Sequence, residues 1–274
     1  MRATLTALAG QSPPPMRTIV VDNHSGDGSA DRIKTEFPEV DTIELPQNAG
    51  YGAGMNAGID RCREAGMDLI LLLTHECRLG SGALAALVGH LTESPGVGAA
   101  GPLLGYLTDE CRVYSAGGLL HPRSWNTRHV DVPVRVDDWR GAPPRAVDYV
   151  DGAALLVREE AARGVGGFDE QYFLYFEETE FLLRMRALGW TVECVPAALA
   201  WQQPGDFGPY FRVRNRLRFL ARNAPGPVLV REFLRVVARM IRVWAQPWSA
   251  HHRRYAREGT RGLLDFLRRR WGPR

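Results

Sequence analysis

The sequence is poor in lysine, in cysteine and in long apolar runs. Lys34 is the only lysine among 34 basic residues, and the four cysteines are widely spaced without a CxxC pair. Isolated cysteines of this kind argue against a disulfide framework and a zinc knuckle, and they favour a reducing compartment such as the cytoplasm. No stretch approaches the roughly 18 to 20 apolar residues that a membrane-spanning helix needs. We therefore expect a globular, cytoplasmic protein.

Acidic residues are scarce in the last quarter of the chain. Residues 210–274 contain 17 arginines and three acidic residues, whereas residues 1–209 contain 17 basic and 28 acidic residues. A basic tail on an acidic body favours an anionic partner surface, although arginines that merely solvate a helical appendage give the same pattern. We expect two units, a globular domain of residues 1–209 and a basic helical extension of residues 210–274.

Residues 228–244 predict an amphipathic helix within this extension. Four arginines fall on one face of the helix, and Trp244 and most of the apolar residues fall elsewhere. This pattern suits a helix that lies on an anionic membrane, which would make the protein peripheral at the inner face of that membrane. Packing against the globular domain uses the same pattern, so both readings stay open. No nucleic-acid recognition motif is present, and no nucleic-acid partner is expected.

The globular domain alternates between strand and helix patterns. Residues 69–73 are five consecutive apolar residues, which predict a strand covered on both faces. Strands are also predicted at residues 18–21 and 41–45, each followed by a glycine-rich turn and a helix. This alternation is typical of an α/β fold with a doubly wound, mostly parallel sheet. The polar residues that follow residue 73 should lie at the sheet edge where such folds bind ligands.

Two later segments carry further candidate residues. Residues 147–157 predict a strand that contains Asp151 and Gly152. A helix is predicted to begin near Glu177, with three glutamates in its first turn below an aromatic cluster. Acids there complement the helix dipole, but three together exceed what capping needs and indicate a functional role.

The stretch between these segments and the earlier strands shows no regular spacing of apolar residues. Residues 121–145 predict a long loop over a site. Its histidines, His121 and His129, are expected to be solvated loop residues.

Five segments occur together in one order. They are IVVDNHSGDGSAD (19–31), LPQNAGYGAGMNAGI (45–59), LILLLTHECRLGSGALAALV (69–88), GGFDEQYFLYFEETEFLLRMRALGW (166–190) and YFRVRNRLRFLARN (210–223). In this order and at these separations they resemble the family 2 glycosyltransferases of the GT-A fold, especially the rhamnosyltransferase-like branch. The resemblance implies transfer of a sugar, with rhamnose as a candidate, from a dTDP- or UDP-sugar with inversion at the anomeric carbon. It implies a glycan, lipid-linked or small-molecule acceptor, and a role in cell wall or polysaccharide synthesis.

The resemblance assigns the donor side of the site. Asp22 matches the acid that hydrogen-bonds the nucleotide base, and Asn48, Gly50 and Asn56 match the turn along the nucleotide. Glu76 falls where the family carries its metal-binding acid. The resemblance thus implies Mg²⁺ or Mn²⁺ on the donor diphosphate, where a divalent cation offsets the negative charge of the leaving group.

The resemblance also assigns the acceptor side. Glu178, next to Glu177, falls on the general base that takes the proton of the acceptor hydroxyl, a role worth roughly 10²- to 10⁴-fold in rate. Asp151 corresponds to the strand beside the acceptor. His75 and Gln202 are candidate further metal ligands, because the family often has a histidine where glutamines follow Trp201.

Some positions depart from the family pattern. The family usually has Asp at positions 76 and 178, and this chain has Glu at both. The first family strand, which lies inside the sheet next to residues 69–73, is missing, because Met1 falls within the following helix. We expect that translation begins upstream of Met1 or that the gene is truncated. These departures leave an alternative function open: a catalytically degenerate relative that binds nucleotide or a partner without turnover.

Overall fold

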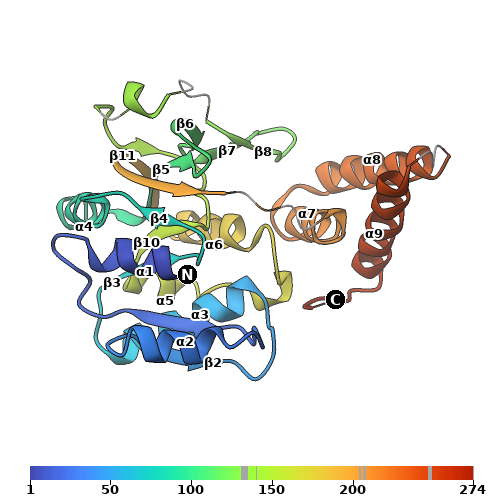
Figure 1. Ribbon diagram of the computed structural model, residues 1–274. Helices are drawn as coiled ribbons and strands as arrows, with labels where there is room; N and C mark the ends of the chain where they lie inside the picture. The colour runs from blue at the N-terminus through green and yellow to red at the C-terminus, as the bar shows by residue number, and fades with distance from the viewer. Residues whose placement is uncertain (131–134, 140, 204, 206–207, 246–248, 274) are drawn as a thin grey trace.

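A seven-stranded sheet forms the centre of the molecule (Figure 1). The computed structural model describes residues 1–274 except residues 131–134, 140, 204, 206–207, 246–248 and 274. The strands, in spatial order, are β3 (Leu69–Leu73), β10 (Ala154–Arg158), β5 (Val97–Tyr106), β11 (Thr191–Gln202) and β4 (Arg78–Leu79), with β6 (Asp109–Ser115) paired to β5 and β9 (Arg145–Ala146) paired to β11. β3, β5 and β11 run in one direction, because β10 is antiparallel to both β3 and β5, and β11 is parallel to β5.

Helices cover both faces of this sheet. One face packs against α3 (Tyr51–Glu64), α5 (Glu159–Gly164) and α6 (Glu177–Ala187), whose inner side chains join one apolar cluster. The other face packs against α4 (Ala83–Glu93), and Leu8 of α1 (Arg2–Ala9) lies against the same second cluster. The predicted doubly wound α/β fold is confirmed.

β3 has the predicted bounds but is less buried than predicted. Ile70 and Leu72 are 3% and 4% exposed, whereas Leu69, Leu71 and Leu73 are only half-buried. β3 lies at the end of the strand order and, within the described residues, pairs only with β10. Ile70 and Leu72 belong to the apolar cluster on the α3 face, whereas Leu69, Leu71 and Leu73 only border the cluster on the opposite face.

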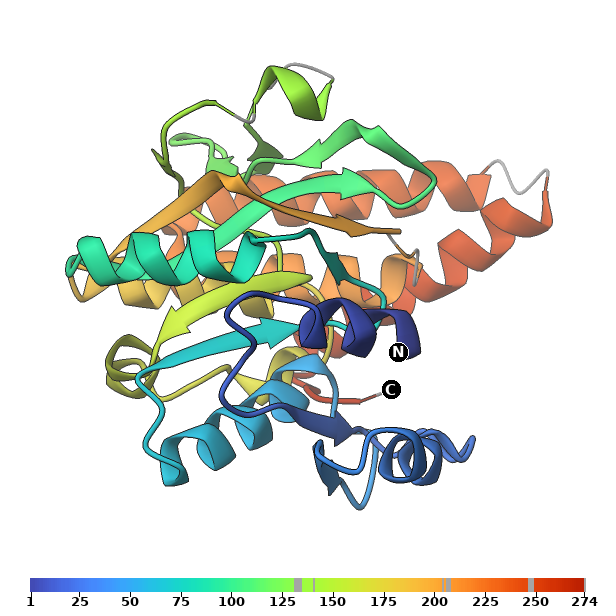
Figure 2. The same ribbon diagram turned by 60° about the vertical axis from the view of Figure 1, so that its left-hand side comes forward.

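A second, two-stranded sheet lies below the central sheet in the view of Figure 2. Its strands β1 (Ile19–Asp22) and β2 (Asp41–Glu44) are parallel and are connected by α2 (Ser29–Glu36). Leu5 of α1 packs with side chains of β1 and α2 in a small apolar cluster. Among the described residues no strand joins β1 to β3, which is where the resemblance places the first family strand.

The predicted strand of residues 147–157 is divided in two. Tyr149 makes an isolated bridge to Gly118, and the regular strand β10 begins only at Ala154. The predicted loop of residues 121–145 contains β8 (Thr127–His129), which forms a hairpin with β7 (Gly118–Leu120), and a short 3-10 helix, η1 (Val136–Asp138). Part of that loop, residues 131–134 and 140, lies outside the described residues.

Three helices follow the sheet domain: α7 (Pro209–Asn223), α8 (Gly226–Ala245) and α9 (Ala250–Leu267). Figure 1 shows them to one side of the sheet. α7 packs on both sides, because Phe219 and Leu220 join a cluster with Tyr172 while Val213 and Leu217 pack with α8 and α9. The division at residues 209 and 210 therefore stays a prediction. In the described residues no helix is both long and apolar enough to cross a bilayer.

Candidate active site

The two glutamates at the start of α6 are preceded by a strained turn. Phe173, Tyr175 and Phe176 have φ angles of 66°, 70° and 72°. For residues with a side chain this left-handed region costs of order 1 to 3 kcal/mol each, so the surrounding structure must fix the turn. Glu177 follows directly, and the turn thus determines where Glu177 and Glu178 lie.

Buried groups from α7 and α3 hold this turn. The Asn215 Nδ2 atom donates to the carbonyl oxygens of Tyr172 and Leu174, at 2.7 Å each, and to that of Tyr175 at 3.1 Å. From α3, the Tyr51 amide donates to the Phe173 carbonyl oxygen at 2.8 Å. Asn215 has no exposed surface. These hydrogen bonds satisfy backbone carbonyl groups of the turn, which would otherwise be buried without partners.

Burial shifts the titration of both glutamates. Glu177 is 3% exposed, and its Oε2 atom has no hydrogen-bond partner in the described structure. Burial and the neighbouring Glu178 hold the pKa of Glu177 well above its ordinary value. Burial, with a further contribution from Asp151, raises the pKa of Glu178 to about 7. A carboxyl group that ionises near neutral pH suits proton transfer.

Gly152 brings α3 and α6 together. The Tyr51 hydroxyl donates to the Gly152 carbonyl oxygen at 2.7 Å. A Cβ atom at position 152 would lie 2.8 Å from the Tyr51 hydroxyl oxygen and 3.5 Å from the Glu178 Cβ atom, so the absence of a side chain permits this contact.

Asp151 faces the hairpin above the site. Its Oδ1 atom lies 3.7 Å from the His129 Nε2 atom, and its buried Oδ2 atom has no hydrogen-bond partner in the described structure. His129 Nδ1 lies 3.1 Å from the Tyr114 carbonyl oxygen. His129 thus lies in β8 rather than in a loop, and its side chain, which is 37% exposed, is placed against Asp151 by the β7 and β8 hairpin.

The residues expected to contact the donor surround the start of α3. The Asn23 amide links the turn after β1 to this helix, because it donates to the Gly50 carbonyl oxygen at 2.8 Å and accepts from the Ala49 amide at 2.9 Å. Asp22 accepts hydrogen bonds from the amide and hydroxyl of Ser25. Asn23 thus brings Asp22 and Gly50 to one place.

Gly50 and Asn56 make close contacts with the segment before α6. Gly50 has a φ angle of 91°, and a Cβ atom there would lie 2.4 Å from the Phe173 carbonyl oxygen. Asn56 forms hydrogen bonds to both backbone groups of Phe168, at 2.8 Å and 3.0 Å. Asn48 accepts a hydrogen bond from the Gly50 amide at 3.1 Å. These contacts hold the turn that we expect to lie along the nucleotide against residues 168–173.

The candidate metal ligands lie at one edge of the sheet. Glu76 precedes β4, and β4 pairs antiparallel with β11 so that Arg78 is opposite Trp201, the residue before Gln202. The Glu76 side chain is 39% exposed, and its Oε2 atom lies 3.2 Å from His75 Nε2. In the described part of the chain, no three His, Cys, Asp or Glu side chains are grouped to hold a metal ion.

A family model described as "Glycosyltransferase like family 2" matches residues 1–220. The chain belongs to this family. A Mycobacterium tuberculosis protein named N-acetylglucosaminyl-diphospho-decaprenol L-rhamnosyltransferase is 27% identical over 216 residues, which are 71% of this chain and 68% of that protein. A pre-mycofactocin glycosyltransferase of the same species is 28% identical over 175 residues, 62% of this chain and 33% of its own length. The protein is therefore a glycosyltransferase.

Solved structures show the same GT-A fold. GalNAc-T7 with UDP, GalNAc and Mn²⁺ gives a TM-score of 0.61 at 14% identity, over 80% of this chain and 45% of that chain. The mannosyltransferase PcManGT from Pyrobaculum calidifontis, in complex with GDP-Man and Mn²⁺, gives 0.55 at 14% identity, over 98% of this chain and 82% of that chain. These likenesses establish the fold of this family 2 glycosyltransferase.

The sheet edge of this glycosyltransferase fits a metal that is shared with a substrate. Mg²⁺ is usually held by one or two carboxylates together with substrate phosphates and water, so a large protein cage is not required. Glu76 offers a partly exposed carboxylate that lies beside the His75 imidazole. Glu76 and Gln202 could therefore supply protein oxygens to a cation that also binds the donor diphosphate.

Several residues of the site were missed by sequence reasoning. Tyr51, Asn23 and Asn215 make hydrogen bonds between segments that are far apart in the chain, for example 27 residues for Asn23 and Gly50 and 101 residues for Tyr51 and Gly152. Tyr51 follows a glycine at the start of a helix, which is a weak signal by itself. Asn215 could have been suspected because an amide in an arginine-rich helix needs partners once it is buried.

Proposed function

We propose that this glycosyltransferase transfers a hexose, with L-rhamnose as the leading candidate, from a dTDP- or UDP-sugar to a hydroxyl of a lipid-linked glycan. The proposal draws its acceptor class and sugar from the name of the mycobacterial relative. The observation that carries the chemistry is the position of Glu178 in the first turn of α6, beside Asp151 and Gly152, where burial raises the pKa of Glu178 to about 7.

The proposed reaction is a single displacement with inversion. The acceptor oxygen forms a bond to the anomeric carbon while the bond from that carbon to the diphosphate oxygen breaks. The Glu178 carboxylate takes the proton of the acceptor hydroxyl as the new bond forms, and the nucleoside diphosphate leaves with the electron pair. A base whose pKa lies near the working pH is partly ionised and still a good proton acceptor, which favours this role.

The remaining residues are proposed to bind and orient the substrates. Asp22 holds the nucleotide base, and the turn at Asn48 and Gly50 lies along the nucleotide. Asp151 orients the acceptor beside Glu178, supported by the unsatisfied Oδ2 atom of Asp151. Asn56 supports the turn through its hydrogen bonds to Phe168.

Glu76, with Gln202 and His75 as further candidates, would hold Mg²⁺ or Mn²⁺. A bound divalent cation would stabilise the negative charge on the departing diphosphate. The arrangement of Glu76 at the carboxyl edge of the sheet supports this assignment.

The test is a turnover assay with purified protein, Mn²⁺, a panel of dTDP- and UDP-sugars, and a polyprenyl-diphosphate-linked N-acetylglucosamine acceptor. Mass spectrometry detects the glycosylated product, and NMR of its anomeric proton reports inversion. Product formation from one donor supports the proposal. Tight nucleotide binding without turnover on any acceptor would instead support the degenerate relative, which the glutamates at positions 76 and 178 first suggested.

A further inference from the structure

The outer side of α8 carries an exposed apolar strip. Val230, Leu234, Ile241 and Trp244 are 58%, 60%, 65% and 48% exposed. Their spacing places them along one side of the helix over most of its 20 residues. Of the nine large apolar side chains exposed in the described residues, six lie in α8 and α9. We call these four residues the α8 strip.

The α8 strip is not the face that packs α8 onto the protein. Val236 and Met240 are 5% and 4% exposed and belong to the cluster that joins α7, α8 and α9. Phe233 and Val237 are partly buried against the same cluster. α8 therefore has enough apolar surface to dock onto its neighbours without the strip.

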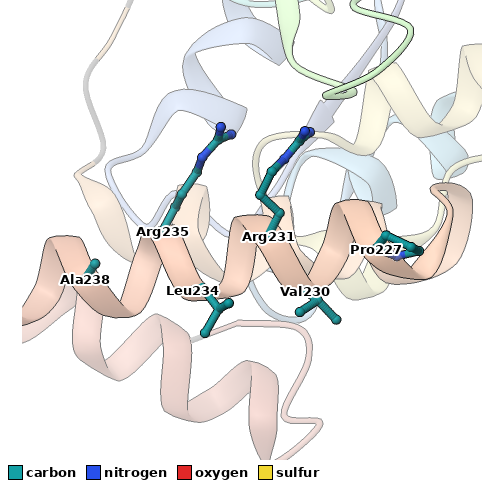
Figure 3. A pocket seen from close by; sticks show the side chains of 6 residues that line it. All are labelled: Pro227, Val230, Arg231, Leu234, Arg235 and Ala238. Carbon is teal, nitrogen blue, oxygen red and sulfur yellow. The ribbon is translucent and has the colours of Figure 1, made fainter.

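Arginines border the strip. Figure 3 shows Arg231 and Arg235 projecting from one side of α8, and Val230 and Leu234 projecting from another. These four residues, with Pro227 and Ala238, line a shallow groove. At the far end of the strip, Trp244 lies in a second depression with Arg257, Arg261 and Arg268 of the α9 region.

The acidic residues of the C-terminal extension do not neutralise the positive charge that the arginines place on its surface. Glu232, Glu258 and Asp265 are its three acidic residues, with side chains that are 17%, 11% and 10% exposed. Each lies within 4.0 Å of an arginine of the extension, Arg235, Arg254 and Arg261 respectively. The exposed charge around the strip is therefore positive.

We propose that the α8 strip and its flanking arginines dock the enzyme onto an anionic lipid bilayer, with α8 lying in the plane of the membrane. Apolar side chains beside arginines are what an interfacial helix needs, because the apolar strip enters the acyl boundary and the guanidinium groups meet lipid phosphates. Trp244, whose Nε1 atom donates to the Thr260 hydroxyl at 2.9 Å, adds a side chain of the type that gathers at membrane interfaces.

Charge argues against other occupants of the strip. A second copy of the chain would bring arginines of both copies together with little exposed acid to face them. A nucleic acid would use the arginines but has no need of the exposed Leu234 and Ile241. The inference stands on the C-terminal helices alone and does not depend on the sugar, the acceptor or the role of Glu178.

The experiment is sedimentation of the full-length protein with vesicles, without donor or acceptor. Vesicles of equal phosphatidylglycerol and phosphatidylcholine should bind the protein at least tenfold more tightly than pure phosphatidylcholine, and added salt should weaken the binding. The double variant Leu234→Gln and Ile241→Gln should partition at least tenfold more weakly. The double variant Arg235→Gln and Arg242→Gln should lose a similar factor on anionic vesicles.

Matched controls change the same residue types elsewhere. Met16 and Leu188 are 91% and 59% exposed outside the C-terminal helices, so the glutamine variant of both should bind as wild type does. Arg32 and Arg163, with side chains 65% and 64% exposed, provide the charge control. Thermal melts check that every variant is folded.

Three results would overturn the inference. The first is wild-type protein that stays in the supernatant with anionic vesicles. The second is unchanged vesicle binding by the Leu234 and Ile241 variant, because the apolar strip would then play no part and a charge-only contact, of the kind a nucleic acid makes, would suffice. The third is a vesicle-free dimer, seen by light scattering, that this variant converts to a monomer.

Discussion

The Asn215 Nδ2 atom lies 2.7 Å from the Tyr172 carbonyl oxygen, which ties α7 to the strained turn before Glu177 and Glu178. The same amide group reaches two further carbonyl oxygens of that turn. A helix outside the central sheet thus determines the conformation of the segment that carries the proposed base. This relationship makes α7 part of the active-site support.

Asn215→Ala is expected to lower both stability and turnover. Losing about two effective hydrogen bonds to buried carbonyls should reduce the free energy of unfolding by ~2 kcal/mol. The turn before Glu177 should then relax, so kcat should fall while nucleotide affinity changes little. Denaturant unfolding, steady-state kinetics and nucleotide titration measure the three quantities.

Asn223 supplies the matched control for this prediction. Its amide donates to the Phe219 carbonyl oxygen at 2.9 Å within the same helix, far from the strained turn in sequence. Asn223→Ala should change kcat by less than about twofold, since surface changes of this kind usually shift stability by no more than ~0.5 kcal/mol. Equal losses in the two variants would contradict a specific support role for Asn215.

Glu178 should make stability depend on pH. Burial raises its pKa to about 7 from the usual 4.5, so the folded protein keeps a proton that the unfolded chain releases. The contribution of Glu178 to the free energy of unfolding should therefore fall as pH rises from about 4.5 to about 7, and stay low above that.

Glu178→Gln removes the free-energy cost of ionising a buried carboxyl group. The variant should exceed wild type in stability by about 1 to 3 kcal/mol at pH 8 and match it near pH 4. Glu160→Gln, which changes an exposed glutamate, should show no pH-dependent difference. Denaturant melts at both pH values measure the effect, and equal stability of Glu178→Gln and wild type at pH 8 would show that the site is not desolvated.

Gly152 and Tyr51 should be energetically coupled. A methyl group at position 152 would meet the Tyr51 hydroxyl oxygen at 2.8 Å, so Gly152→Ala should reduce kcat strongly by displacing Tyr51 or Glu178. Tyr51→Phe removes that oxygen, and the double variant should recover part of the loss. The measurement is a double-mutant cycle on kcat/KM, with a coupling energy of at least ~0.5 kcal/mol expected. Strict additivity would contradict the contact, and Tyr255→Phe on α9 serves as the remote control.

Glu76→Gln should weaken metal-dependent donor binding. In a thermal-shift assay, dTDP or UDP with Mn²⁺ at ~100 times its dissociation constant should add about 2.7 kcal/mol of stability to wild type. The Glu76 variant should lose most of the Mn²⁺-dependent part and keep any metal-independent part. Glu39→Gln, which changes an exposed acid before β2, is the control. An unchanged Mn²⁺ response in the Glu76 variant would remove Glu76 from the metal site.

The sequence predicted local features of this fold well. The bounds of β3 match the prediction, because five apolar residues between polar ones leave few alternatives. The start of α6 at Glu177 also matches, since its acids and its apolar spacing agree. The resemblance supplied the family, which the match over residues 1–220 bears out.

Long-range contacts limited the prediction of the site. Gly152 meets Tyr51, a residue 101 positions away, and the apolar spacing within residues 147–157 carries no trace of this contact. His129 reaches Asp151 only because β7 and β8 form a hairpin. Such contacts depend on packing between segments, which local sequence patterns do not encode.

The most direct measurement compares product formation by wild type, Glu178→Gln and Glu160→Gln across pH 5 to 9 with the active donor and acceptor. Wild-type kcat should rise with pH and level off above about 7, as Glu178 loses its proton. Glu178→Gln should lose 10²-fold or more, the typical size of general-base catalysis, and should lose the pH dependence, while Glu160→Gln behaves as wild type. Wild-type turnover that Glu178→Gln retains would contradict Glu178 as the base.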